Sequence, residues 1–231
     1  MVWHNCTENV MMPDHNNVAL SSWQASEVKE NYGIDCIPLG MGLNELEYKP
    51  VKDISDRFLF VARIDPRKGL HYAAKVCAEL GVELDIIGGM PADDHPIFQH
   101  YLNDTLSFIK EHSNLHYLGE VSQEEKIKRM QEAKATILPY MPDAHSLVLI
   151  ESMLCGTPVI ALNEGAFVEL NIHGITGFNM NRPEQMRNAI KAIGMIDRTT
   201  VRNYAMDKYS YKTIIPRYEK ICQMISGGFR W

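Results

Sequence analysis

The sequence predicts an α/β fold built on a doubly wound, Rossmann-like parallel sheet. From residue 57 onward, short runs rich in β-branched and aromatic residues alternate with longer segments whose apolar residues have helical spacing. Two of the short runs, ATILPY (135–140) and GTPVIAL (156–162), have the continuous apolar pattern of buried strands. Strands joined by connections of helix length must pair in parallel through right-handed crossovers, and this requirement predicts the sheet.

The alternation begins with RFLFVARI (57–64), a predicted strand. The segment after Pro66 predicts a helix that Gly81 ends, because its apolar residues have helical spacing. These apolar residues are Leu70, Ala73, Ala74, Val76, Cys77 and Leu80. The next predicted elements, in order, are a strand at 83–89, a helix at about 95–112 and a strand at 114–119.

Ser122 begins the next predicted helix, since a hydroxyl followed three residues later by Glu125 has the form of a capping box. That helix runs to about residue 133. The remaining predicted elements, in order, are a strand at 135–139, a helix at 146–155, strands at 158–162 and 177–180, and helices at 183–196 and 211–225.

Residues 1–50 differ from this alternating part of the chain. Their predicted elements are a strand near 18–21, a helix at 22–32 and a strand at 36–40, followed by a linker at 41–53. Ser21 or Ser22 would start the helix, because a hydroxyl side chain caps the first turn.

Composition excludes several classes of protein. Lys plus Arg number 23 against 29 Asp plus Glu, and the net charge of −6 argues against a nucleic-acid partner. The five cysteines form no C-x-x-C pair, so a disulfide framework is not expected and a reducing cytosol fits best.

His112 and His116 are four residues apart but lack the glutamate of a zinc-protease motif, so no metal site is expected. Neither a membrane-spanning helix nor a secretory signal is expected, which favours a cytoplasmic protein and leaves peripheral membrane attachment open.

The segment DAHSLVLIE (143–151) places Asp143 and Glu151 eight positions apart at the start of an apolar helix. A strand precedes this helix, so its N-terminal amides should lie above the carboxyl edge of the sheet and attract an anion. The neighbours of Glu151 are mostly apolar, so its carboxylate should be buried and need a partner, which a ribose diol would supply. A carboxylate on the helix surface is the competing interpretation. The segment therefore predicts a nucleotide-sugar site.

The segment VARIDPRKG (61–69) supplies cations at the same edge of the sheet. Arg63 ends a strand, and Lys68 lies where the next helix starts. A guanidinium fork and an ammonium group both suit a diphosphate. The alternative is a solvated turn with ordinary surface charges, which is the role expected for Arg67.

The segment NEGAFVELNIHGITGF (163–178) places two small residues, Gly165 and Ala166, at a further helix start. Small side chains there allow an anion to approach the backbone closely. Glu169 falls one turn into this predicted helix.

Together these motifs resemble the C-terminal, donor-binding domain of a retaining glycosyltransferase of family 4, which has the GT-B architecture. The resemblance runs from about Val18 to about Met224 and depends on the order of its motifs, which are VALSSW, IPLGMG, VARIDPRKG, LDIIGG, LGEVSQEE, AKATILPY, D-x7-E, LCGTPVIA, GAFVE, HGITGF and YSYKTIIPRYEK. It implies that residues 1–50 are a short remnant of an N-terminal domain with a linker. Residues 51–208 would then form the nucleotide-sugar-binding domain, and residues 209–231 the final crossover helix and tail.

The resemblance also implies roles for the charged residues. Arg63 and Lys68 would neutralise the donor diphosphate and the leaving group. Glu151 would hold the nucleotide ribose, and Asp143 would contact the transferred sugar near its anomeric carbon. His4, in the opening VWHN, would reach the same sugar.

The other donor-binding positions follow from the same resemblance. The amides at the helix start would bind phosphate oxygens, and they belong to Ser146, Leu147 and Val148. Gly88, Gly119 and Val121 lie in the loops expected beside the base, and Glu169 would complete the donor site.

The chain departs from the family pattern at several positions. Asp143 stands where the family has Glu and is shorter by one methylene group, and His145-Ser146 replaces an aromatic–glycine pair. Ala166 replaces a second glycine. Compared with that family pattern, the resemblance also implies that nearly all of an N-terminal acceptor domain would be missing from these 231 residues.

The expected function is transfer of a sugar from a nucleotide diphosphate-sugar to a hydroxyl acceptor by a metal-independent, hexosyltransferase-like enzyme without a cofactor. The acceptor would be a glycan, a lipid or a protein. A partner chain or a second copy would replace the missing N-terminal domain. The alternative is a non-catalytic nucleotide-sugar-binding module, or one half of a two-chain transferase.

Overall fold

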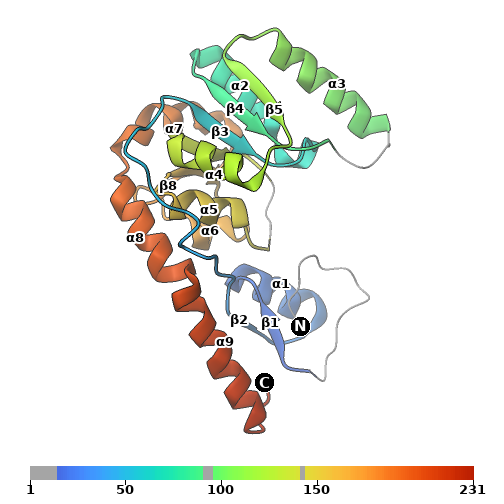
Figure 1. The fold of residues 1–231 in the computed structure, drawn as a ribbon. Helices are drawn as coiled ribbons and strands as arrows, with labels where there is room; N and C mark the ends of the chain where they lie inside the picture. The colour runs from blue at the N-terminus through green and yellow to red at the C-terminus, as the bar shows by residue number, and fades with distance from the viewer. Residues whose placement is uncertain (1–14, 91–95, 141–143) are drawn as a thin grey trace.

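A fully parallel, six-stranded sheet forms the centre of the protein (Figure 1). The computed structural model describes residues 15–90, 96–140 and 144–231. The strands lie in the order β5-β4-β3-β6-β7-β8. Their bounds are β3 (Phe58–Val61), β4 (Leu84–Ile87), β5 (Leu115–Gly119), β6 (Ala135–Leu138), β7 (Val159–Leu162) and β8 (Gly177–Met180). This order confirms the predicted doubly wound α/β class.

Helices cover both faces of the sheet, and for this reason its central strands are buried along their whole length. The helical elements are η1 (Pro66–Lys68), α2 (Leu70–Leu80), α3 (Pro96–Lys110), α4 (Gln123–Glu132), α5 (Leu147–Leu154), α6 (Phe167–Leu170), η2 (Pro183–Gln185), α7 (Met186–Ala192), η3 (Ile193–Met195), α8 (Arg198–Tyr209) and α9 (Tyr211–Ser226). On one face α2 contacts α3 and α7, and on the other α5 contacts α4 and α8.

The predicted start and stop signals form as expected. The Ser122 hydroxyl accepts a hydrogen bond from the Glu125 amide and caps α4. Gly81 adopts a left-handed conformation (φ 64°) and ends α2. The predicted helix at 183–196 is instead divided into η2, α7 and η3.

Helix α8 was not predicted from the sequence. Asp197 caps it by accepting hydrogen bonds from the Thr199 and Thr200 amides. Only Val201 and Ala205 are buried in this helix, so its apolar periodicity is weak. Its position depends on packing against α5 rather than on a pattern of its own.

The N-terminal unit is a separate pair of parallel strands with one helix, formed by β1 (Asn17–Ala19), α1 (Ser22–Tyr32) and β2 (Cys36–Pro38). The Ser21 side chain caps α1, as predicted. Helix α9 runs from the sheet domain along this unit (Figure 1). There the Tyr218 hydroxyl donates to the Gly40 carbonyl, and the Trp231 indole donates to the Asn17 carbonyl.

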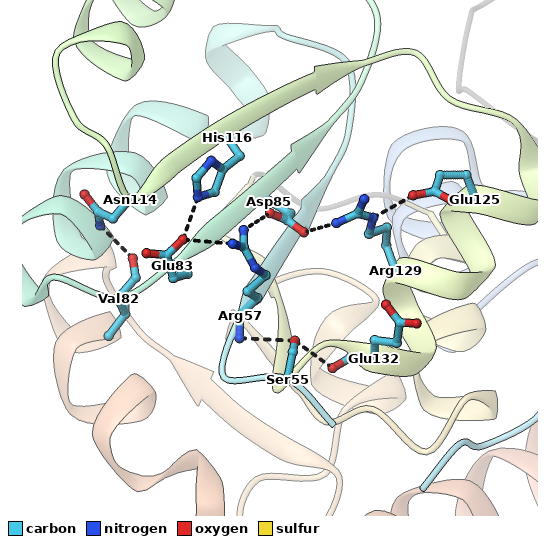
Figure 2. Close-up of polar contacts among 10 residues, drawn as sticks. All are labelled: Ser55, Arg57, Val82, Glu83, Asp85, Asn114, His116, Glu125, Arg129 and Glu132. Carbon is cyan, nitrogen blue, oxygen red and sulfur yellow. Dashed lines mark hydrogen bonds and ion pairs between the residues drawn. The ribbon is translucent and has the colours of Figure 1, made fainter. Parts of the chain in front are cut away.

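A cluster of charged side chains ties α4 to the amino ends of β3 and β4 (Figure 2). The Asp85 side chain is only 5% exposed. Its two oxygens accept from the Arg57 guanidinium at 2.8 Å and from the Arg129 guanidinium at 2.9 Å. The same arginines also pair with Glu83 and Glu125, respectively. The buried carboxylate is thus fully compensated, which is the condition for its stability.

We expect Asp85→Ala to lower the free energy of unfolding by about 3 kcal/mol, because two partly buried arginines lose their shared acceptor. Asp56→Ala is the control, since Asp56 pairs with Lys134 in solvent and should matter little. Urea unfolding followed by circular dichroism measures both variants. Equal midpoints for the two variants would contradict the role assigned to the cluster.

Candidate functional site

The order of strands reverses direction between β3 and β6, and in doubly wound sheets ligands bind at the carboxyl ends of the two strands at such a reversal. They pair directly, with Phe58 opposite Ala135 and Leu59 opposite Thr136. The loop that follows β3 and the loop that follows β6 therefore lie next to each other. Gly69 shows how close they are, because a Cβ atom there would lie 2.3 Å from the Pro139 carbonyl oxygen.

The loop after β3 carries the predicted cations. Asp65 is buried and caps η1, and the Arg67 guanidinium pairs with its carboxylate. Hydrogen bonds from Arg67 hold the pKa of Asp65 below its usual value. Arg67 is thus an exposed partner of Asp65, whereas Arg63 is exposed at the end of β3 and Lys68 is half-buried.

Lys68 reaches the loop after β6 through an aromatic ring. Its ammonium nitrogen lies 4.1 Å from the centroid of Tyr140, a cation–π distance. The Tyr140 hydroxyl is 3.3 Å from the Ser146 hydroxyl. Ser146 in turn caps α5 by accepting from the Leu149 amide. The structure therefore places Lys68 beside the start of α5, as predicted.

The start of α5 has the properties of an anion site. Leu147 and Val148 occupy the first turn, whose amides have no partner inside the helix. Leu147 is 40% exposed, so this turn is open to solvent. The helix dipole adds a partial positive charge at the same point.

Glu151 lies in the second turn of α5 and is only 5% exposed. The Lys126 ammonium donates to both of its oxygens, at 2.8 and 2.9 Å, and the Tyr48 hydroxyl donates to Oε1 at 2.9 Å. The prediction of burial was correct. However, the chain itself supplies partners for the carboxylate, so burial alone does not require a ribose. The ribose-binding role stays a prediction.

Sequence reasoning did not identify Lys126 or Tyr48. Tyr48 falls in the predicted linker, and Lys126 is one of several charged residues on a polar helix. Burial and the carboxylate together raise the pKa of Tyr48, which keeps its hydroxyl protonated as a donor. A buried carboxylate without a cation nearby in sequence was the one available signal that a distant partner exists.

The glycines predicted beside the base meet at the same edge of the sheet. The Gly88 amide donates to the Gly119 carbonyl at 3.0 Å. A Cβ atom at Gly88 would lie 1.8 Å from the Ala62 carbonyl oxygen, so this residue must be glycine for β3 and β4 to stay close. Gly119 has a left-handed φ of 71°, and Val121 is half-buried. Their contact with a base stays a prediction.

Glu169 has a partner that the sequence did not suggest. Its carboxylate accepts from the amides of Ser22 and Trp23, at 3.1 and 3.0 Å, and so caps α1 of the N-terminal unit. His145 also contacts this side, with Nε2 3.3 Å from the Met41 carbonyl. The N-terminal unit therefore borders the carboxyl edge of the sheet. A contact of Glu169 with a donor stays a prediction.

Two predicted residues, His4 and Asp143, lie outside the described residues. Within the described ranges, no group of three or more His, Cys, Asp and Glu side chains is arranged to hold a metal ion. In the same part of the chain, no helix has both the length and the apolar character needed to cross a membrane.

A cavity of about 900 Å³ lies elsewhere, between α2, α3 and the η2–α7 segment. His71, Tyr101 and Arg187 are among the residues that line it. It belongs to a helical layer rather than to the carboxyl edge of the sheet. A functional site chosen by cavity size alone would therefore be placed away from the predicted site residues.

Comparison with known families matches residues 47–210 to the family described as Glycosyl transferases group 1. A D-inositol 3-phosphate glycosyltransferase of Paenarthrobacter aurescens is 25% identical over 182 residues. That match covers 69% of this chain and 43% of the relative. A protein of the cps region of Klebsiella pneumoniae is also 25% identical, with 71% of this chain and 45% of the relative covered. The chain thus spans less than half the length of these relatives.

Solved structures show the same fold. AviGT4, a glycosyltransferase involved in avilamycin A biosynthesis, matches 93% of this chain and 64% of its own at 20% identity, with a TM-score of 0.75. HepE of Anabaena, solved with UDP and glucose, matches 91% of this chain and 62% of its own at 18% identity, with a TM-score of 0.77.

We expect Gly88→Ala to lower the free energy of unfolding by about 1–3 kcal/mol, because the added methyl group forces β3 and β4 apart. Gly194→Ala is the matched control, since open space surrounds that position and the methyl group should be tolerated. Thermal unfolding of both variants tests the difference. A Gly88→Ala protein as stable as the Gly194→Ala protein would show that the two strands do not need this close approach.

Proposed function

This chain belongs to the glycosyl transferases group 1 family, and on that premise we propose that it transfers a sugar from a nucleotide diphosphate-sugar to a hydroxyl acceptor with retained anomeric configuration. The proposal rests on one observation. Lys68 lies beside the start of α5, at the point of the sheet edge where the strand order reverses. Glu151 lies about one turn further along the same helix.

The proposed reaction breaks the bond between the anomeric carbon and the donor diphosphate and forms a bond from that carbon to the acceptor oxygen, while the acceptor's hydroxyl proton passes to the released diphosphate. Negative charge grows on the departing diphosphate while positive charge grows on the sugar ring. Preorganised donors and cations stabilise such charge without rearranging during the reaction. In the proposed mechanism, Lys68, Arg63 and the first-turn amides of α5 would do this for the diphosphate without a metal ion.

The relatives support a nucleotide-sugar as the donor. HepE of Anabaena has been solved with UDP and, in another crystal, with UDP-glucose. The structure with UDP-glucose matches 91% of this chain. A hexose is the sugar class that we propose, and the acceptor is a hydroxyl of a glycan, a lipid or a protein.

Calorimetry with UDP- and GDP-sugars, followed by a turnover assay on the same chain, tests the proposal. Binding with sugar transfer or donor hydrolysis supports the transferase. Binding without turnover would instead support the alternative function, a nucleotide-sugar-binding module or one half of a two-chain transferase. Absence of binding to every nucleotide-sugar would reject both.

We expect Lys68→Ala to reduce sugar transfer or donor hydrolysis by about 30- to 1000-fold, since losing one such donor costs roughly 2–4 kcal/mol of barrier. Arg67→Ala is the control, because the Arg67 guanidinium is turned to Asp65. Steady-state kinetics of both variants would check this. Full activity of Lys68→Ala would remove the proposed mechanism.

A further inference from the structure

Lys126 and Glu151 form a close pair beside the proposed donor site. Lys126 lies near the start of α4, shortly after Gly119 at the end of β5 and Val121 in the loop that follows. Helix α4 packs against α5, which carries Glu151. The Lys126 side chain is 19% exposed and that of Glu151 is 7% exposed, so the pair is mostly covered but reachable from solvent.

The pair leaves one acceptor position on the carboxylate. A carboxylate can accept in about four directions. Oε1 receives the Tyr48 hydroxyl and the Lys126 ammonium, whereas Oε2 receives Lys126 alone. One direction on Oε2 therefore stays available among the contacts of the described chain.

The pair also leaves one donor. An ammonium group has three N–H bonds, and Glu151 takes two of those of Lys126. Within the described residues, Lys126 makes no other hydrogen bond. The pair thus presents one acceptor and one donor side by side.

Neighbouring contacts hold the pair in place. The Gln123 amide donates to the Tyr48 hydroxyl at 3.0 Å, which directs the tyrosine proton toward Glu151. The Arg202 guanidinium donates to the carbonyls of Tyr48 and Leu154, joining the linker to the end of α5. Glu151 is therefore fixed in position before any ligand arrives.

A ribose diol has the matching pattern. One hydroxyl can donate to Oε2 of Glu151, and the oxygen of the adjacent hydroxyl can accept from Lys126. We propose that Lys126 is a specificity-determining residue that, together with Glu151, recognises the two ribose hydroxyls of the nucleoside diphosphate. The inference rests on the proposed function, because it assumes that a nucleotide occupies this site.

The test is a comparison of ligands within each protein variant. Calorimetry first establishes whether UDP or GDP binds the wild-type chain. The one that binds is then compared with its 2′-deoxy and 3′-deoxy forms, on the wild-type chain and on Lys126→Met, Lys126→Arg and Lys128→Met. Lys128 is the matched control, an exposed lysine on the same helix.

In the wild-type chain, loss of either hydroxyl should weaken binding by about tenfold, the effect of one charge-assisted hydrogen bond. Lys126→Met should weaken binding of the ribonucleotide by about tenfold, and one of the two deoxy forms should then bind as well as the ribonucleotide. Lys126→Arg should keep most of the discrimination, and Lys128→Met should match the wild-type chain.

Two results would overturn the inference while leaving the donor site intact. In the first, Lys126→Met weakens the ribonucleotide and both deoxy forms by the same factor, which would make Lys126 only a counter-ion of Glu151. In the second, Lys126→Met binds all three like the wild-type chain. Failure of the wild-type chain to bind either nucleoside diphosphate would reject the donor site itself, and this inference with it. Partial unfolding would also weaken all three ligands by one factor, so the circular dichroism spectrum of Lys126→Met must match that of the wild-type chain before the titrations are compared.

Discussion

The pairing of β3 with β6 is the constraint on which the candidate site depends. These strands are far apart in sequence, yet their register places the two following loops at one point of the sheet edge. Lys68 comes from one loop and the start of α5 from the other. Their contact through Tyr140 exists only because the strand order reverses here. Every charged group assigned to a diphosphate is placed by this one arrangement.

Buried carboxylates in this protein are compensated by cations from other elements. Asp85 in β4 is held by Arg57 and Arg129, and Glu151 in α5 is held by Lys126. Arg57 immediately precedes β3, so the Asp85 cluster lies at the amino ends of the strands (Figure 2). The ion pairs of Asp85 with Arg57 and Arg129 hold α4 against the sheet. Lys126, on the same helix, is thus positioned to contact Glu151. A structural cluster thereby supports the geometry of the candidate site.

The N-terminal unit contributes to the same edge through its backbone. Glu169 caps α1 through the amides of Ser22 and Trp23, while Tyr218 of α9 and the C-terminal Trp231 donate to backbone carbonyls of the N-terminal segment. A carboxylate at a helix N-terminus is favourable for both groups. Glu169 therefore links the unit to α6, and a donor that contacts Glu169 would meet a carboxylate that is already engaged.

The sequence by itself determined the α/β class, the order of most strands and helices along the chain and the positions of several helix caps, because periodicity and capping residues are local signals. It also located Lys68 and Ser146 at one edge. Only the tertiary structure decided which groups satisfy Glu151, since Lys126 and Tyr48 lie 25 and 103 residues away in sequence. It likewise decided the close approach of Gly88 to Ala62, and the formation of α8 with its weak pattern. A charged residue in an apolar sequence segment indicates that a partner is needed, but the packing of helices on the sheet determines which residue that partner is.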